Sequence, residues 1–457
     1  MRKEQDSMGT MDVPEDALYG ASTQRAVLNF PVSGHCMPRG FICCCGLLKM
    51  ACARANLKLG RLDQETAETI EKVAVEVYQG QHAEHFPVDV FQTGSATSTN
   101  MNVNEVIANR CSQLAGQPIG SRIPVHPNDH CNLGQSSNDT MPSVLHMSVA
   151  LELRDTLRPA LRQLERSLNK QAKAFRGIVK IGRTHLMDAT PVRLGQSFSG
   201  YAAQLKKAQK RVDRAISSLQ ELAIGGTAVG TGINGHPDFA PLVVAYVNGA
   251  TGMKFREADN HFEAQAGRDD CVEVAGQLLA ISASLTKVAN DIRLLGSGPR
   301  CGLGELQLPA TQPGSSIMPG KVNPVMSEML VQACLYANGQ CQTVANCGRD
   351  GHFELNVTIP LMAYALHESI RVLGSGASLF AERCIDGLEA NEAQIEKYLE
   401  ESLMLVTALN PHIGYDKAAH VAKRAFAEGR TLREIVLEEK LMPAKALDKA
   451  LDPRKMV

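Results

Sequence analysis

The chain has 457 residues, of which 44% are apolar, so it is long enough for two to four domains with a large hydrophobic core. Its 47 lysines and arginines nearly balance its 48 aspartates and glutamates, and a net charge of -1 gives no electrostatic reason to expect nucleic acid or an anionic membrane as partner. A small anionic ligand remains compatible with this balance, because a single pocket can be basic on a neutral protein. The polar first dozen residues are unlike a leader sequence, so we expect a cytoplasmic protein.

Thirteen cysteines are scattered along the chain without CxxC pairs, which favours reduced thiols over a disulfide framework or a zinc site. The run Cys43 to Cys45 and Cys52 lie in the apolar stretch ICCCGLLKMACA, which is too short and too charged to span a bilayer. Adjacent side chains on a helix point in different directions. We therefore interpret these thiols as core filling rather than as a metal or redox site.

The first helical pattern in the chain is short. Apolar residues at Ala67, Ile70, Ala74 and Val77 predict a helix that stops at Gly80. Loop-like polar segments follow, as far as about residue 134. We predict a separate N-terminal domain over residues 1–134.

The next region, residues 135–388, carries apolar residues that step by three and four over long stretches. This spacing predicts long amphipathic helices, which we place at 157–175, 194–222, 271–295, 325–346 and 361–380. Such helices belong in a bundle with shallow crossing angles, so the predicted fold class is all-α with a central long-helix bundle domain. Strand signals are sparse, apart from short candidates such as 178–181.

The predicted helix at 271–295 is apolar on nearly every side, so it has to be buried on several sides. One bundle supplies part of that burial, and bundles of other subunits would supply the rest. We therefore predict a homo-oligomer. A small C-terminal helical domain is predicted over 389–457, with a helix at 416–427 closed by Gly429.

Four polar loops place small hydroxyl and amide residues beside helix starts, at 93–102, 135–139, 183–185 and 314–324. The last reads GSSIMPGKVNP, where glycine and proline exclude a continuous helix. For any one of these residues a helix N-cap is the simpler interpretation. Together they offer neutral donors with one lysine and one histidine, which suits a small dicarboxylate better than a phosphate or a metal.

Three motifs of the chain are discounted. Gly230 to Gly235 match GxGxxG, but they follow a predicted long helix rather than a strand, which argues against a dinucleotide site. The segments 82–85 and 126–130 each contain two histidines without the HExxH spacing, and Pro127 interrupts the second. Surface or turn histidines are the interpretation we adopt, and we predict no metal site.

The loops resemble, as a set, those of the fumarase/aspartase superfamily. GSSIMPGKVNP resembles the superfamily signature, and GRTHLMDATP, VHPNDHCNLGQSSND, FELNV and TALNPHIGYDKAA are similar to the class II fumarate hydratase branch. The similarity covers almost the whole chain. It implies an all-α fold of three domains, a homotetramer around a twenty-helix core, and active sites assembled from three subunits.

The resemblance also implies a reaction, the reversible hydration of fumarate to L-malate through an aci-carboxylate, without a metal or an organic cofactor. Ser315 would be the base that takes the C3 proton, and Lys321 and Asn323 would hold the charged carboxylate. His185 would exchange a proton with the water, oriented by Glu328. The implied substrate-binding residues are Ser95, Thr97, Ser136, Ser137, Asn138, Thr184 and Ser316.

A second dicarboxylate site is implied at His126, Asn128 and Asp129. Relatives often carry basic residues directly before it, whereas Ile123 and Pro124 intervene here after Arg122, which puts its anion affinity in question.

Two alternatives stay open. Aspartate ammonia-lyase shares the fold and the serine loop, but usually has glutamine where this chain has His185. A non-catalytic scaffold, as in lens crystallins, would not require Ser315, Lys321, Asn323, His185 and Glu328 together.

Overall fold

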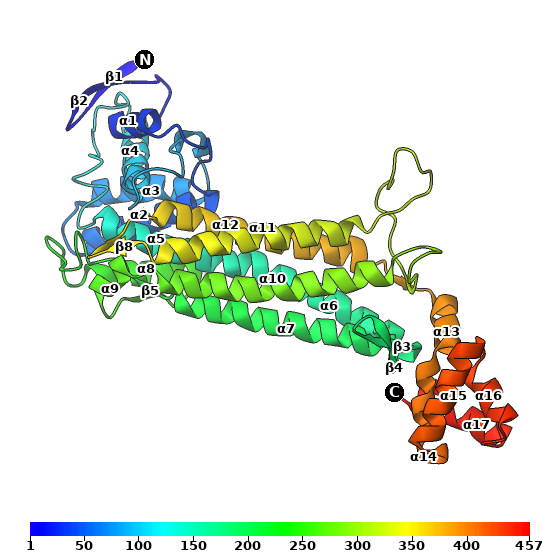
Figure 1. The fold of residues 1–457 in the computed structure, drawn as a ribbon. Coiled ribbons are helices and arrows are strands. Elements are labelled where there is room, and N and C mark those ends of the chain that lie inside the picture. The colour runs from blue at the N-terminus through cyan, green and yellow to red at the C-terminus, as the bar shows by residue number, and fades with distance from the viewer. The chain divides into compact units, whose positions relative to one another are not determined.

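The structure is a computed structural model that describes residues 1–457. Helices dominate, and the strands form only two-stranded sheets (Figure 1). All five predicted long helices are present: α6 (Arg158–Ala174), α7 (Leu194–Ser218), α10 (Asp269–Leu295), α11 (Val325–Gly348) and α12 (Ile359–Phe380). The prediction of an all-α fold is confirmed.

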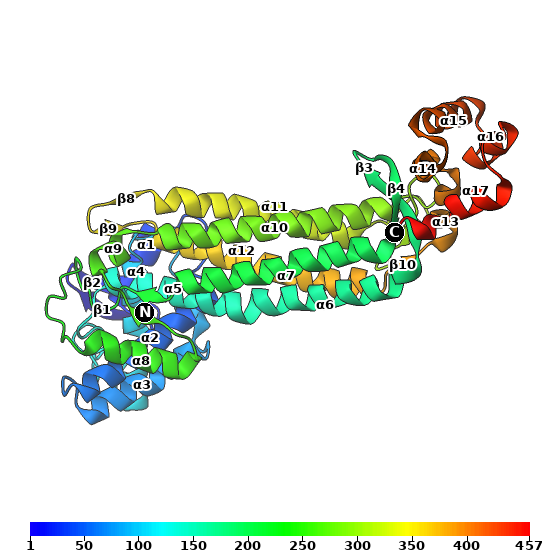
Figure 2. The same cartoon turned by 90° about the horizontal axis from the view of Figure 1, so that it is seen from below.

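The chain divides into two compact units, and each long helix contributes residues to both. Unit 1 comprises Met1–Pro159, Lys210–Ser282 and Cys334–Gly374, and unit 2 comprises Ala160–Gln209, Ala283–Ala333 and Ser375–Val457. Within each unit the helix segments lie side by side (Figures 1 and 2). In unit 1, Ser282 of α10 donates to Asn338 of α11. In unit 2, the Tyr201 hydroxyl of α7 donates to Asp291 of α10 over 2.7 Å.

Unit 1 begins with an antiparallel hairpin and contains the shorter N-terminal helices. Its elements are β1 (Arg2–Asp6), β2 (Gly9–Val13), α1 (Ala21–Asn29), α2 (Arg39–Lys58), α3 (Gln64–Tyr78), α4 (Thr97–Leu114), α5 (Ser137–Glu152), β5 (Glu221–Leu222), α8 (Phe239–Thr251), β6 (Arg256–Glu257), α9 (His261–Ala266), β8 (Gly351–His352) and β9 (Leu355–Asn356). Short turns of 3-10 helix (Ala83–His85) and π-helix (Leu153–Leu157) complete it. The predicted helix ending before Gly80 is α3.

Helix α2 is the centre of unit 1, because it packs against α3, α5 and α8. Gly46 permits the close approach to α3, since a Cβ there would lie 2.6 Å from the backbone nitrogen of Tyr78. Cys44, Cys45 and Cys52 are buried at 3%, 1% and 1% exposure, and none of them forms a disulfide. The interpretation as core filling agrees with the burial of these three thiols, whereas Cys43 of the same run is half-buried.

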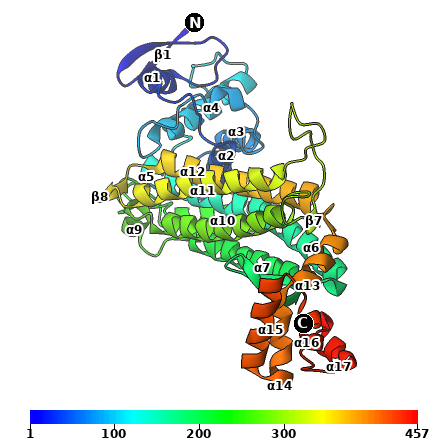
Figure 3. The ribbon, with the colours of Figure 1, turned by 45° about the vertical axis from the view of Figure 1, so that its right-hand side comes forward.

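Unit 2 contains a hairpin, short helical turns and the C-terminal helices. Its elements are η3 (Phe175–Gly177), β3 (Val179–Thr184), β4 (Met187–Arg193), β7 (Leu306–Gln307), η4 (Ala381–Ile385), β10 (Glu389–Ala390), α13 (Glu392–Glu401), η5 (Leu403–Leu409), α14 (Asn410–Ile413), α15 (Tyr415–Glu428), α16 (Leu432–Glu438), α17 (Ala444–Ala450) and η6 (Pro453–Lys455). The predicted helix closed by Gly429 is α15, and Gly429 has the left-handed φ of 63°. Figure 3 shows α13 to α17 gathered together.

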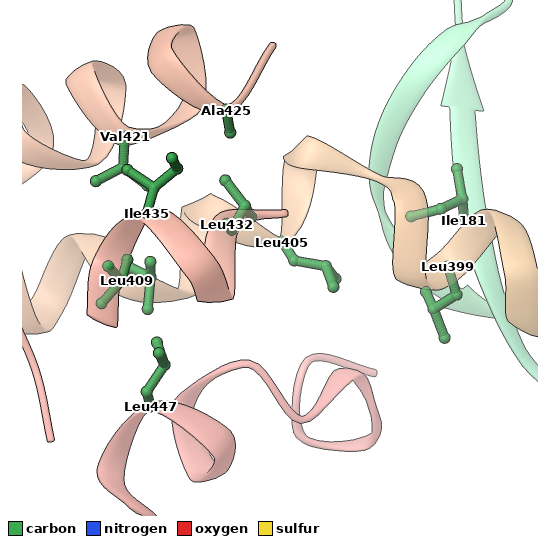
Figure 4. Close-up of a cluster of buried hydrophobic side chains, with 10 residues drawn as sticks. Ile181, Leu399, Leu405, Leu409, Val421, Ala425, Leu432, Ile435 and Leu447 are labelled. Carbon is green, nitrogen blue, oxygen red and sulfur yellow. The ribbon is translucent and has the colours of Figure 1, made fainter. Parts of the chain in front are cut away.

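The C-terminal helices share a small apolar core of their own (Figure 4). Leu409, Val421, Ile435 and Leu447 meet there, each fully buried. Ile181 of β3 and Leu399 of α13 belong to the same cluster. This contact attaches the β3–β4 hairpin to the C-terminal helices.

One predicted helix is too long. The helix predicted over 194–222 ends at Ser218, and Glu221–Leu222 pair in parallel with Arg256–Glu257. The carbonyl of Gln220 accepts from the N–H of Arg256 over 2.8 Å, so the backbone finds its partners in β6 instead of in a further helical turn.

Helices α2 and α10 are each long and apolar enough to cross a membrane by length and composition alone. In α2, 78% of the apolar window is buried inside the chain. Core helices of globular proteins meet the same criterion, so this is weak evidence for a membrane span.

Candidate active site

The β3–β4 hairpin carries Thr184 and His185 at its tip. His185 and Leu186 have left-handed φ values of 55° and 63°, as a two-residue turn of this kind requires. The His185 side chain is exposed and has no hydrogen-bond or ionic partner within the chain. The turn therefore leaves the imidazole free to contact a ligand or another chain at the tip of this hairpin.

The loop 314–324 is closed on itself by backbone and amide contacts. The Gly314 N–H donates to the Lys321 carbonyl over 2.8 Å, and the Asn323 amide donates to the Gly314 carbonyl over 2.9 Å. A Cβ on Gly314 would lie 2.5 Å from the Lys321 oxygen, so only glycine allows this closure. The loop thus holds Ser315, Lys321 and Asn323 within one closed segment of ten residues, 314–323.

The hydroxyl of Ser315 lies in a turn that points backbone N–H groups at it. Its Oγ accepts from the N–H of Ile317 over 3.2 Å and from that of Met318 over 3.1 Å. Donors aimed at an oxygen stabilise negative charge on it. This geometry supplies part of the support that a serine alkoxide requires.

Glu328 lies in the first turn of α11, directly after the loop. Its side chain makes no hydrogen bond to His185 or to any other residue of the chain. A cavity of about 550 Å³ adjoins the loop and is lined by Lys321, Asn323 and Arg293, among others. Cationic and amide groups of unit 2 therefore face one hollow.

Unit 1 brings together a second group of predicted residues, joined by hydroxyl contacts. The Thr97 oxygen lies 2.7 Å from Ser95 Oγ and 2.7 Å from Ser137 Oγ, so three hydroxyls form a row. Ser95 and Ser137 are buried, at 6% and 8% exposure. The row crosses from the start of α4 to the start of α5.

The start of α5 is fixed by a capping box. The Ser136 Oγ accepts from the Asn138 N–H over 3.2 Å, and Asp139 accepts from the Ser136 N–H over 3.0 Å. Asp139 also accepts from the N–H groups of Gly225 and Thr227. Burial raises the pKa of this carboxyl to about 6 despite its three backbone donors. Asp139 was not among the predicted site residues.

A cavity of about 660 Å³ lies over these residues in unit 1. Its lining combines hydroxyls and amides: Thr97, Asn100, Asn132, Gln135, Ser136, Ser137 and Thr227, together with Asn128 and Asp129. Residues predicted for the substrate site and for the second dicarboxylate site therefore border the same hollow.

The predicted second site is organised around the ring of His126. Its Nδ1 accepts from the backbone N–H groups of Asn128 and Asp129, over 3.2 and 3.1 Å. Burial lowers the pKa of His126, which favours the neutral ring. Arg122 donates to the carbonyl of Gln5.

Two further histidines lie close to a carboxylate. Ligand atoms of His82, Glu84 and His85 lie within 4.8 Å of one another. Each ring already has a partner, because His82 Nε2 lies 2.7 Å from Glu76 and His85 Nδ1 accepts from the Leu18 N–H. These contacts fit the interpretation as turn histidines.

Two buried ionic features beside the candidate site were missed from the sequence. Glu305 is fully buried and pairs with Arg183 over 2.6 Å and with Lys180 over 3.1 Å. Lys49 is 1% exposed and donates to Asn132 and Gln135. The one available signal for Lys49 was its position as the single charged residue in ICCCGLLKMACA.

Comparison with known proteins places this geometry in a family. The Lyase family model matches residues 9–339, and the model of the fumarase C C-terminus matches residues 405–457. A class II fumarate hydratase of Thermosynechococcus vestitus is 51% identical over 98% of this chain and 96% of that protein. The chain belongs to the class II fumarate hydratase family.

Other members agree with this assignment over their full length. Mitochondrial fumarate hydratase of Homo sapiens is 49% identical and covers 100% of this chain and 90% of that protein. The crystal structure of a class II fumarase from Schistosoma mansoni superposes with a TM-score of 0.96 at 39% identity, covering 100% of this chain and 98% of the other. The family is one of lyases, so the chain is an enzyme of that class, acting on a small dicarboxylate.

Proposed function

We propose that the chain hydrates fumarate reversibly to L-malate, with Ser315 and His185 as the acid and base on opposite sides of the substrate. The activity follows from the family, to which the chain is similar over its full length. The roles of the individual residues are those that the resemblance implies. One observation supports the role of Ser315 in particular. Its hydroxyl accepts hydrogen bonds from two backbone N–H groups, in a loop that also contains Lys321 and Asn323.

In the direction from malate, Ser315 takes the proton from C3. The electron pair of the C–H bond moves into the adjacent carboxylate, which becomes an aci-carboxylate with two negative charges. The ammonium group of Lys321 and the amide of Asn323 stabilise this charge. Before the transfer the Ser315 hydroxyl loses its proton to solvent, and the N–H groups of Ile317 and Met318 stabilise the alkoxide that remains.

The second half of the reaction expels the hydroxyl from C2. His185 gives this oxygen a proton, so that it departs as water while the C2–C3 double bond forms. In hydration the same imidazole takes a proton from the attacking water. Glu328 would orient the ring and raise its basicity.

The remaining contacts come from the hydroxyl row and its neighbours. Ser95, Thr97 and Ser137, with Ser136 and Asn138, would bind the substrate carboxylates through neutral donors, and Thr184 and Ser316 would add one hydroxyl each. His126, Asn128 and Asp129 would form the second dicarboxylate site, with weak anion affinity because the pKa of His126 is lowered by burial.

We further propose that active sites are completed between chains of a homotetramer. His185 and Glu328 both lack a partner within the chain. Large apolar side chains of the long helices are exposed, with Leu279 at 39%, Leu294 at 43% and Leu335 at 63%. Such exposure on bundle helices fits burial against other copies.

The proposed compartment is the cytoplasm. Its support is a set of buried thiols, among them Cys44, Cys45 and Cys52, that form no disulfide.

Two variants test the assigned roles. Ser315→Ala and His185→Asn should each lower kcat by more than about a hundredfold, the usual worth of a general acid or base. His412→Asn, a matched change on the C-terminal helix α14, should leave kcat unchanged. Near-normal activity in both site variants would contradict the roles while leaving the family assignment intact.

A further inference from the structure

Lys49 is an anomaly in the core of unit 1. It lies in the middle of α2, at 1% exposure, and forms no salt bridge, although the buried carboxylate of Asp139 lies close enough to favour its charged form. Burial lowers the pKa of this lysine. An apolar side chain of similar length would fill the same space without the cost of burying an ammonium group. Filling of the core alone therefore gives no reason for a lysine here.

The ammonium group donates to two amide oxygens and forms no direct ion pair. Its Nζ donates to Asn132 Oδ1 over 3.0 Å and to Gln135 Oε1 over 2.8 Å. Both acceptors lie in the segment that leads into α5. They are 83 and 86 residues away from Lys49 in sequence, so the contact joins the core helix to a distant loop.

Asn132 also contacts the neighbouring helix α4. Its Oδ1 also accepts from the amides of Asn100 and Asn104, over 3.1 and 3.3 Å, and its own Nδ2 donates to the Gln135 carbonyl. One oxygen therefore accepts from three residues of two helices. This concentration of donors is typical of a junction that sets the position of a loop.

The junction lies directly beneath the cavity of unit 1. Asn132 and Gln135 line that cavity beside Ser136, Ser137 and Thr97. Lys49 is therefore one hydrogen bond away from the hollow. The residues lining that hollow contribute a carboxylate at Asp129 and no lysine or arginine.

We propose that Lys49 is a positioning residue for the dicarboxylate, acting through Asn132 and Gln135. It holds the segment before Ser136 in the conformation that aims the hydroxyls at the ligand. It also supplies a fixed positive charge beneath a cavity whose lining has none. The proposal rests on the proposed function and assigns to it a residue that never touches the substrate.

The test compares two ways of removing this charge. Lys49→Met keeps the volume and deletes the ammonium group, whereas Asn132→Asp keeps the lysine and gives it a carboxylate partner. Both should raise KM for fumarate and Kd for L-malate by about tenfold, the effect of one charge-assisted hydrogen bond. The kcat of each should change by less than about threefold, because Ser315 and His185 are untouched. Leu48→Met, a volume-conserving change at a fully buried neighbour on α2, should leave both parameters unchanged.

The outcomes separate the possible failures. A wild-type enzyme that does not hydrate fumarate would contradict the proposed function itself. An active wild type with unchanged KM and Kd in Asn132→Asp would overturn the role of Lys49, even if Lys49→Met failed to fold. A loss of thermal stability without any change in KM would reduce Lys49 to a structural residue and would equally overturn the proposal.

Discussion

The guanidinium of Arg183 donates to the carboxylate of Glu305 over 2.6 Å, and the same carboxylate lies 3.1 Å from the ammonium group of Lys180. Arg183 immediately precedes Thr184 and His185 at the tip of the hairpin. Glu305 lies in the segment between α10 and the serine loop, where its N–H donates to the Leu295 carbonyl. One buried carboxylate thus connects the hairpin that carries His185 to the segment that leads into the serine loop.

Removing that carboxylate should be costly. Glu305→Ala leaves two cations at 6% and 15% side-chain exposure without a counter-ion, which should lower the free energy of unfolding by about 3–5 kcal/mol. Lys180→Met removes only one of the two cations and should have a smaller effect. Thermal unfolding at a fixed protein concentration measures both. Equal stability of Glu305→Ala and the wild type would show that the pair does not anchor the hairpin.

The hydroxyl row predicts a change in substrate binding. Thr97→Val keeps the shape of the side chain but removes the central oxygen, so Ser95 and Ser137 lose their shared partner. KM for fumarate should rise about tenfold. Thr97→Ser restores the hydroxyl and should recover most of the affinity. Steady-state kinetics of the two variants distinguish a lost hydrogen bond from a packing effect.

Closure of the serine loop depends on one glycine. Gly314→Ala places a methyl group 2.5 Å from the Lys321 oxygen, so the loop has to open. We expect kcat to fall at least about tenfold, because Lys321 and Asn323 would leave their positions relative to Ser315. Gly249→Ala is the matched control, since its Cβ meets nothing within 4 Å in α8. That variant should keep its activity and gain a little stability.

His146 predicts a dependence of stability on pH. The ring is buried in α5, its Nδ1 lies 2.8 Å from the Glu221 carbonyl, and burial lowers its pKa from 6.5 to about 3. Between these values the unfolded chain binds a proton that the folded chain does not, so stability is lost as the pH falls below 6.5. At pH 5 this loss is about 2 kcal/mol.

The matched variant is His146→Asn, which keeps a donor toward Glu221 but does not titrate. Urea denaturation at about pH 7.5 and about pH 5, at one protein concentration, should show a smaller acid-induced loss in the variant than in the wild type. An identical loss in both proteins would contradict the assignment of a depressed pKa to His146.

The long helices could be predicted because their buried residues recur every three or four positions in the sequence. Val274, Leu278, Ile281 and Leu285 recur at helical spacing, and each is buried. The end of α7 could not be predicted in this way. Leu219 and Leu222 continue the apolar spacing, but Glu221 and Leu222 pair with residues that lie 35 positions further along the chain.

In the candidate site, too, residues that cluster in the sequence could be predicted, and residues with distant partners could not. Ser315, Lys321 and Asn323 lie within nine residues, so their loop was visible as a local cluster. Lys49 and Glu305 act on partners more than eighty residues away, and no local pattern marks such contacts. Neither His185 nor Glu328 has a side-chain hydrogen bond or ion pair within the chain, so the structure of one chain gives no contact that would mark their roles.

The most direct test is to follow the absorbance of fumarate with the purified protein, first alone and then with ammonium, and to determine the chirality of the product. We predict that fumarate disappears without ammonium and yields L-malate. Consumption that requires ammonium and yields L-aspartate would contradict this account in favour of an ammonia-lyase. No consumption in either case would contradict it in favour of a scaffold or another substrate.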